Sequence, residues 1–206
     1  AAHALAVVCN PNNPTGAAYD DAALRSFAER CRVADTPLLV DEAFLGFTER
    51  PSLAGTDGVV VARSLTKLFG LPGLRAGFAV ATGELGAALK NVRRPWNVGV
   101  PALATGSHCM QSTEFIEDTR ECVTAERRRL RESLGSRFDV HPSSAPFLLL
   151  DAGQLDRHVD GILEHAREHG LALRDARTFG GLDSHVRVAV REPDANDRLL
   201  EVLGDV

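Results

Sequence analysis

The sequence predicts an α/β fold, in which a mostly parallel sheet with covering helices is followed by a small α+β domain. Short apolar runs in the first half of the chain end in polar residues, as buried strands do. Segments with apolar residues at helical spacing lie between these runs. A proline-containing break then leads to a long helical stretch and to shorter strands and helices. Strands that alternate with helices are typical of parallel sheets with right-handed crossovers.

The first half carries most of the strand signal. Apolar residues recur at helical spacing from Asp20 to about Val33, with Asp20 or Asp21 as a plausible N-cap. A second helix is expected over 83–91. Strands are expected at 4–8, 37–40, 58–62 and 75–81. Ligands collect at the carboxyl ends of strands in such sheets, so the polar residues just past these strands can converge there. These residues are Asn13, Asp41 and Ser64.

The stretch RRPWNVGVP interrupts this pattern with two prolines. A long helical stretch rich in Arg and Glu follows, from about Pro101 to Leu134, and we expect it to link two domains. The predicted organisation is a large-domain portion at 1–98, a linking helix at 99–134 and a small C-terminal domain at 135–206. In the small domain, strands are expected at 147–151, 171–175 and 185–190, and helices at 156–170 and 193–203.

The composition narrows the class of partner. The 206 residues carry a net charge of −5 and no basic stripe, which argues against nucleic acid but allows a small phosphorylated ligand. No apolar run of about 18 residues occurs, so we expect no membrane partner. The four cysteines form no CxxC pair and no zinc spacing. This pattern indicates reduced thiols in the cytoplasm and no metal site.

Lysine is scarce in this chain, which draws attention to Lys67. Of 23 Lys and Arg residues, only Lys67 and Lys90 are lysines. Arginine stays protonated, whereas a lysine can lose its proton and form an imine. A coding bias toward arginine also explains the scarcity, so the neighbouring residues must decide between chemistry and chance.

Polar side chains surround this lysine in the predicted topology. Asn13, in NPNNPTG, could donate to an anionic oxygen, although the motif also suits a simple turn. Asp41 ends an apolar strand and is expected to be largely buried. It therefore needs a partner, for which a cationic ring nitrogen is one candidate, and the alternatives are a cap or a salt bridge to an arginine. Ser64 and Arg75 flank Lys67, and a hydroxyl with a guanidinium suits a phosphate group. The alternative for Arg75 is a surface charge at the start of a strand.

The order of these motifs resembles a known family. NPTG, then DEAF at a strand end, then SLTK with an arginine eight residues after its lysine resemble fold-type-I pyridoxal 5′-phosphate (PLP) enzymes of the aminotransferase class I/II group. The resemblance covers essentially the whole chain. It implies an incomplete large domain of the aspartate aminotransferase-like PLP-dependent transferase fold, with PLP as cofactor.

The resemblance also implies roles for individual side chains. Lys67 would be the catalytic residue that forms an imine with PLP. Asp41 would hold the ring nitrogen protonated, and Asn13 would contact the ring hydroxyl oxygen. Ser64 and Arg75 would bind the cofactor phosphate.

Near the end of the chain, HVRVAVR matches the segment in which the family keeps an arginine for the substrate carboxylate. The resemblance places that role on Arg187, and the alternative is an exposed strand charge. The family also implies a homodimer.

Within the group, the chain is similar to two subfamilies. Histidinol-phosphate aminotransferases usually carry tyrosine at the position of Phe44, whereas SLTK, GLPGLRAGF and PWNV look more like threonine-phosphate decarboxylases of cobalamin biosynthesis. Such a lyase converts O-phospho-L-threonine to (R)-1-amino-2-propanol phosphate and CO2. We expect this decarboxylation, with histidinol-phosphate-type transamination as the alternative. Both reactions use a small phosphorylated substrate.

Members of the group are longer and have a preceding segment that supplies a phosphate-binding turn and an aromatic residue stacked on the ring. This chain starts without methionine in the apolar run AAHALAVV. We therefore expect it to correspond to the C-terminal part of such an enzyme. An alternative of another class is a truncated, non-catalytic remnant that acts as an interaction partner. The presence of Lys67, Asp41 and Arg75 argues against that alternative.

Overall fold

The computed structural model describes residues 3–156 and 158–206. Residues 1, 2 and 157, which the predicted ranges 1–98 and 135–206 include, lie outside this description. The chain divides into two compact units. The first comprises Ala1–Pro11 and Ala18–Glu117, and the second comprises Asn12–Ala17 and Asp118–Val206. Among the described residues, no helix has both the length and the apolar character needed to cross a membrane.

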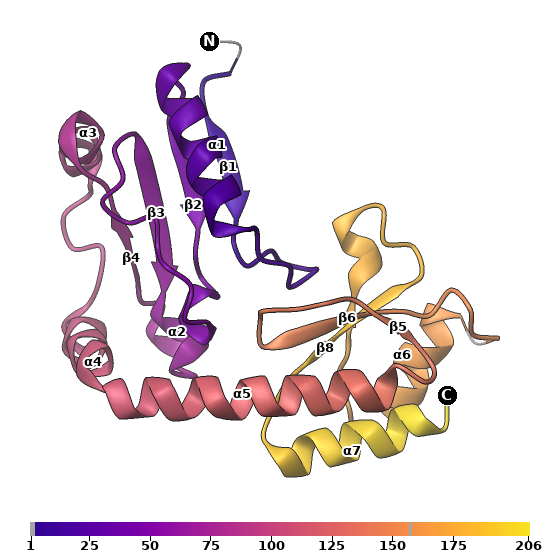
Figure 1. Cartoon of the computed structure of the whole chain (residues 1–206). Coiled ribbons are helices and arrows are strands. Elements are labelled where there is room, and N and C mark those ends of the chain that lie inside the picture. Colours follow the sequence, from indigo (N-terminus) through magenta and orange to yellow (C-terminus); the bar gives the residue numbers. More distant parts are fainter. Residues whose placement is uncertain (1–2, 157) are drawn as a thin grey trace. The chain divides into compact units, whose positions relative to one another are not determined.

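The first unit contains a four-stranded sheet in the order β1-β2-β3-β4 (Figure 1). Its strands are β1 (Ala6–Cys9), β2 (Leu38–Asp41), β3 (Val59–Ser64) and β4 (Gly77–Val80). The first three strands run parallel and β4 runs antiparallel to β3, so the sheet is mostly parallel, as predicted. The crossover from β1 to β2 is the helix α1 (Asp21–Val33).

Side chains of the central strands alternate between two faces of this sheet. Leu38 and Val40 of β2 are buried in one cluster with Val59 and Val61 of β3 and with apolar residues of α1. Asp20 fixes the start of α1, because its carboxylate accepts a hydrogen bond from the Ala23 amide at 3.0 Å. The intervening residues of β2 and β3 therefore face the opposite side of the sheet.

The helical region after β4 differs from its prediction. The single linking helix expected over 99–134 is two helices, α4 (Val100–Gln111) and α5 (Thr113–Leu134), and α3 (Gly83–Val92) precedes them. Ser112 separates α4 from α5 with a ψ of 66°, which is not helical. Its hydroxyl donates to the His108 carbonyl at 3.0 Å. Serine competes for backbone groups in this way and favours helix ends.

The second unit contains an antiparallel sheet in the order β5-β6-β8-β7. Its strands are β5 (Asp139–Val140), β6 (Phe147–Asp151), β7 (Arg174–Asp175) and β8 (His185–Ala189). Leu148, Leu150, Val186 and Val188 pack on one face against α5, α6 (Val159–Glu168) and α7 (Pro193–Gly204). The predicted small α+β domain is therefore present, with β5 as an additional short strand.

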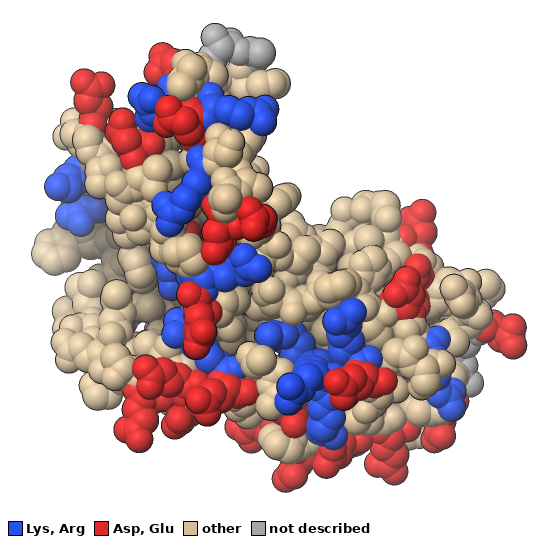
Figure 2. Space-filling view, viewed as in Figure 1, with Lys and Arg blue, Asp and Glu red and all other residues tan. Residues whose placement is uncertain are grey.

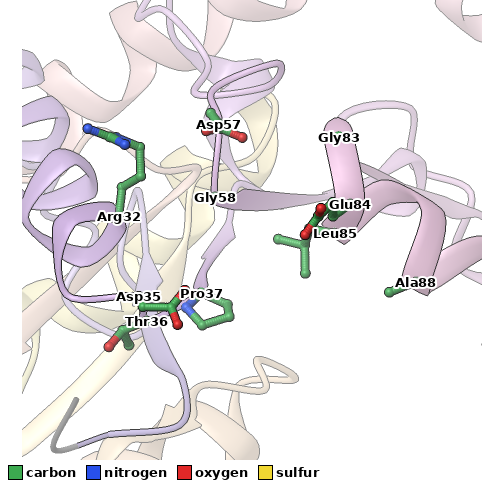
Figure 3. Close-up of a pocket in the computed structure, with 10 residues that line it drawn as sticks. All are labelled: Arg32, Asp35, Thr36, Pro37, Asp57, Gly58, Gly83, Glu84, Leu85 and Ala88. Atoms are coloured by element: carbon green, nitrogen blue, oxygen red, sulfur yellow. The ribbon is translucent and has the colours of Figure 1, made fainter.

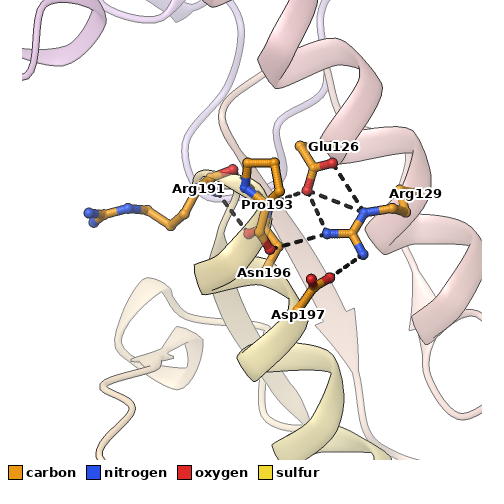
Figure 4. A network of polar contacts seen from close by, with 6 residues as sticks. All are labelled: Glu126, Arg129, Arg191, Pro193, Asn196 and Asp197. Atoms are coloured by element: carbon orange, nitrogen blue, oxygen red, sulfur yellow. Dashed lines mark hydrogen bonds and ion pairs between the residues drawn. The ribbon is translucent and has the colours of Figure 1, made fainter.

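A buried polar network ties α5 to α7 in this unit (Figure 4). The Asn196 side chain is fully buried, and its amide donates to Glu126 Oε2 at 2.7 Å and to the Arg191 carbonyl at 2.6 Å. Its Oδ1 atom accepts from the Arg191 amide at 2.9 Å. Arg129 binds Glu126 at 2.7 Å, and this contact lowers the pKa of the Glu126 carboxyl. Both polar atoms of the Asn196 side chain are therefore hydrogen-bonded within the protein, which makes up for the contacts with water that burial removes.

Replacing Asn196 by alanine should destabilise the second unit, because it leaves the Arg191 backbone groups and one Glu126 contact without a partner. We expect a loss of about 2 kcal/mol in the free energy of unfolding, measured by urea denaturation. Glu201→Ala is the matched control, since Glu201 lies on the same helix but is exposed and is not one of the network residues in Figure 4. Equal losses in the two variants would contradict the structural role of the buried network.

Candidate active site

Two adjacent carboxylates at the end of β2 face opposite sides of the first sheet. Glu42 is only 1% exposed and lies on the core side. It accepts hydrogen bonds from Ser52 Oγ at 2.6 Å and the Leu53 amide at 2.9 Å, and it forms an ion pair with Arg63 at 3.1 Å. The nearby arginine therefore neutralises Glu42 and leaves Asp41 for another partner.

Asp41 is half-buried, which corrects the expectation that it is largely buried. The reason is its position on the face away from the α1 core. Its neighbours in register are Cys9 on β1 and Ala62 on β3, both small residues. Its Oδ1 atom accepts from the Ala43 amide at 2.9 Å. A carboxylate flanked by small side chains on both neighbouring strands can support a flat cationic ring laid over this face.

Lys67 lies in the short helix α2 (Leu65–Leu68), which directly follows β3. Its side chain is exposed, and Nζ lies 5.9 Å from the centroid of the Phe44 ring. Phe44 follows Asp41 by three residues after β2. The lysine amine and the aspartate therefore lie at the same carboxyl edge of the sheet, formed by β2 and β3. Among the described residues, Lys67 forms no ion pair.

Hydroxyl groups and a guanidinium frame this edge. Ser64 Oγ lies 2.8 Å from the hydroxyl oxygen of Thr66, a residue that the sequence analysis did not select as a site residue. The signal for Thr66 was present in the SLTK motif, where two hydroxyls precede the lysine. Arg75 is exposed and donates to the Pro72 carbonyl at 3.3 Å.

The backbone around Arg75 is unusual. Arg75 has φ 48° and ψ 38°, a left-handed conformation that costs a non-glycine residue roughly 1–3 kcal/mol. Gly77 pairs with Ser64, and a Cβ at Gly77 would lie 2.7 Å from the Arg63 carbonyl oxygen. The close approach of the two strands at Gly77 thus holds Ser64 in register. Glycine would be less strained than arginine at this position.

Asn13 and Arg187 contact each other in the second unit, to which the loop Asn12–Ala17 belongs. Arg187 Nη1 donates to Asn13 Oδ1, and its guanidinium lies 4.7 Å from the centroid of the Phe147 ring. Burial, followed by the charge of Arg174, lowers the pKa of Arg187. Arg187 is therefore a half-buried cation rather than a free surface charge. The convergence of Asn13 with Asp41 and Ser64 stays a prediction.

Arg174 is a second arginine on this sheet face that the sequence analysis missed. It is the cross-strand partner of Arg187 in the β7·β8 register. It donates to Thr178 Oγ1 at 3.0 Å and lies over the Phe179 ring at 5.3 Å. Two neighbouring guanidiniums on one face suit a ligand with two anionic groups. Sequence spacing could not reveal this pair because β7 is only two residues long.

A cavity of about 610 Å³ in the first unit has neither Asp41 nor Lys67 in its described lining (Figure 3). Its lining includes Pro37 and Gly58, which directly precede β2 and β3, and Leu85 of α3. It therefore lies at the amino ends of the strands, opposite Asp41 and Ser64. We place the candidate active site at the carboxyl edge, because the titratable and hydroxyl side chains gather there.

The chain is similar to known proteins of the family that its motifs resemble. The family model for aminotransferase class I and II matches residues 1–203. Over 207 residues the chain is 31% identical to histidinol-phosphate aminotransferase 2 of Archaeoglobus fulgidus, covering 98% of this chain and 58% of that protein. It is 33% identical to threonine-phosphate decarboxylase of Salmonella typhimurium over 210 residues, covering 97% of this chain and 56% of that enzyme.

A solved structure has the same fold. The histidinol-phosphate aminotransferase from Clostridium acetobutylicum matches with a TM-score of 0.89 and 26% identity, covering 97% of this chain and 62% of that one. The chain thus spans little more than half the length of the two curated relatives above. From the match to its family model along almost its whole length, the chain belongs to the aminotransferase class I and II family.

Proposed function

We propose that this chain forms part of a PLP-dependent lyase that decarboxylates O-phospho-L-threonine to (R)-1-amino-2-propanol phosphate and CO2, a step of cobalamin biosynthesis. The observation that carries the proposal is the position of Asp41 and Lys67 at one carboxyl edge of the sheet, with small residues beside Asp41. PLP bound there supplies an electron sink for the bond that breaks at the substrate Cα. One fold can host different reactions, so the assignment of a reaction must rest on the residues of the site.

Each proposed role follows from the chemistry of the side chain. Asp41 keeps the pyridine nitrogen protonated through a charge-assisted hydrogen bond. Lys67 would hold the cofactor through its amine, and its Nζ atom would be the group that gives a proton to the substrate carbon. Ser64, Thr66 and Arg75 bind the cofactor phosphate through two hydroxyls and a guanidinium.

The hydrogen bond between Asn13 and Arg187 leaves other donor groups of both side chains available for ligands. The Asn13 Oδ1 atom accepts a hydrogen bond from Arg187, so the Asn13 NH2 group would be the one available for the ring hydroxyl oxygen of PLP. Arg187 has further N–H groups for a substrate carboxylate, and Arg174 adds a positive charge for the substrate phosphate. A substrate with both a carboxylate and a phosphate, such as phosphothreonine, uses both arginines.

The second candidate is a histidinol-phosphate-type aminotransferase. The identity to an archaeal enzyme of that name favours it. Phe44 argues for the lyase, because that aminotransferase subfamily usually has a tyrosine here and Phe44 has no hydroxyl to bind the ring oxygen. In either case we propose a homodimer with a small phosphorylated substrate. A non-catalytic remnant is the candidate from another class.

Lys67→Arg should abolish covalent attachment of PLP, because a guanidinium keeps the charge but cannot form an imine. The complete protein with added PLP should be yellow, and borohydride should fix an adduct on the peptide that contains residue 67. Lys90→Arg is the matched control, since it changes the other lysine of the chain and should keep both signals. A yellow, borohydride-fixed Lys67→Arg variant would overturn the assignment, and a colourless wild type would favour the remnant.

Phosphothreonine supplied without any 2-oxo acid should release CO2 continuously, because a decarboxylase regenerates its cofactor without an amino acceptor. We expect trapped ¹⁴CO2 from carboxyl-labelled substrate, at a rate lowered about 10²–10⁴-fold in Lys67→Arg. Amino transfer from histidinol phosphate to 2-oxoglutarate is measured in parallel. Transfer without CO2 release would replace the lyase by the aminotransferase.

A further inference from the structure

A cavity of about 500 Å³ in the second unit is lined by three arginines of α5: Arg127, Arg128 and Arg131. Thr124 and the turn at Pro142 and Ser143 complete much of its wall. Figure 2 shows basic side chains gathered over the later part of α5. A cavity of this size lies within the range of small-molecule sites. It is separate from the face that carries Arg187 in β8.

Arg127 is the anchor of this cavity. Its Nη1 group donates to the Ala145 carbonyl at 3.4 Å and its Nη2 group to Thr124 Oγ1 at 3.4 Å. Burial lowers the pKa of the Arg127 guanidinium. In the described part of the chain, none of the ion pairs involves Arg127, and both of its hydrogen bonds go to neutral oxygens. A desolvated charge without a counter-ion is costly, and a bound anion would remove that cost.

The spacing of the three arginines along α5 also favours a bound anion. Arg127 and Arg131 stand at i,i+4 and Arg128 and Arg131 at i,i+3, where like charges destabilise a helix. Glu132 is the one acidic residue among the described lining residues. Arginines also complement the C-terminal end of a helix. That role suits Arg131 in the last turn, but it does not explain a half-buried Arg127 one turn earlier.

We propose that this cavity binds the phosphate group of a small molecule, at a site distinct from Arg187. Guanidiniums match a phosphate in charge and in bidentate geometry. The cavity wall also adjoins the loop of Asn13, because the Ser144 amide donates to the Gly16 carbonyl at 2.7 Å. A ligand on this turn therefore contacts the segment that supports Asn13. The inference does not depend on the reaction proposed above.

Inorganic phosphate is the probe that tests this site. We expect calorimetric titration of the complete, PLP-loaded protein to show a phosphate site whose Kd rises at least tenfold in the double variant Arg128→Gln/Arg131→Gln. Arg25→Gln is the control for charge alone, since Arg25 is exposed on α1. It should keep the wild-type Kd, whereas Arg187→Gln reports any phosphate bound at the substrate face. Arg128→Gln alone, with a smaller rise, covers the case in which the double variant does not fold.

Three results would overturn the site. Phosphate binding that is unchanged in both Arg128 variants would exclude these side chains as ligands. Loss of binding in Arg187→Gln instead would assign the phosphate to the substrate face. Absence of phosphate binding to the wild type would exclude a phosphate site in this cavity.

Discussion

The buried carboxylate of Glu42 is the interaction on which the candidate active site depends. A carboxylate that is 1% exposed is tolerated only because Ser52, the Leu53 amide and Arg63 satisfy it. These contacts fix which face each residue of β2 presents. A slip of one residue would exchange Glu42 with Asp41 and bring the wrong carboxylate to the open face. A structural ion pair on one side of the sheet thus determines the chemistry available on the other.

Much of the fold was predictable, because strands and helices of the first unit carry strong local signals. Alternating burial in β2 and β3 and the Asp20 cap of α1 follow directly from residue types. The division between α4 and α5 was not predicted, since Ser112 is a weak breaker whose effect depends on its bond to the His108 carbonyl. Strand β5 was missed because two residues carry no periodicity.

The candidate site was predictable only where its residues are close in sequence. Ser64, Lys67 and Arg75 lie in one segment, and Asp41 ends the neighbouring strand, so parallel topology brings them to one edge. The partnership of Asn13 with Arg187 joins residues that lie 174 positions apart, and no local pattern encodes it. Arg174 could be recognised only from the register of β7 with β8, because no local pattern encodes its pairing with Arg187 either.

Arginine and lysine have separate tasks in this chain. Arg187 and Arg127 are both partly desolvated, which lowers the pKa of each guanidinium. They stay charged because the unperturbed pKa of arginine lies far above neutral pH, whereas a lysine in either place would be much easier to deprotonate. In the proposed function Lys67 has the opposite requirement, since its amine would have to give up a proton. Lysine therefore stands at the strand end where proton transfer is proposed, and arginine holds the positions where a fixed positive charge must survive burial.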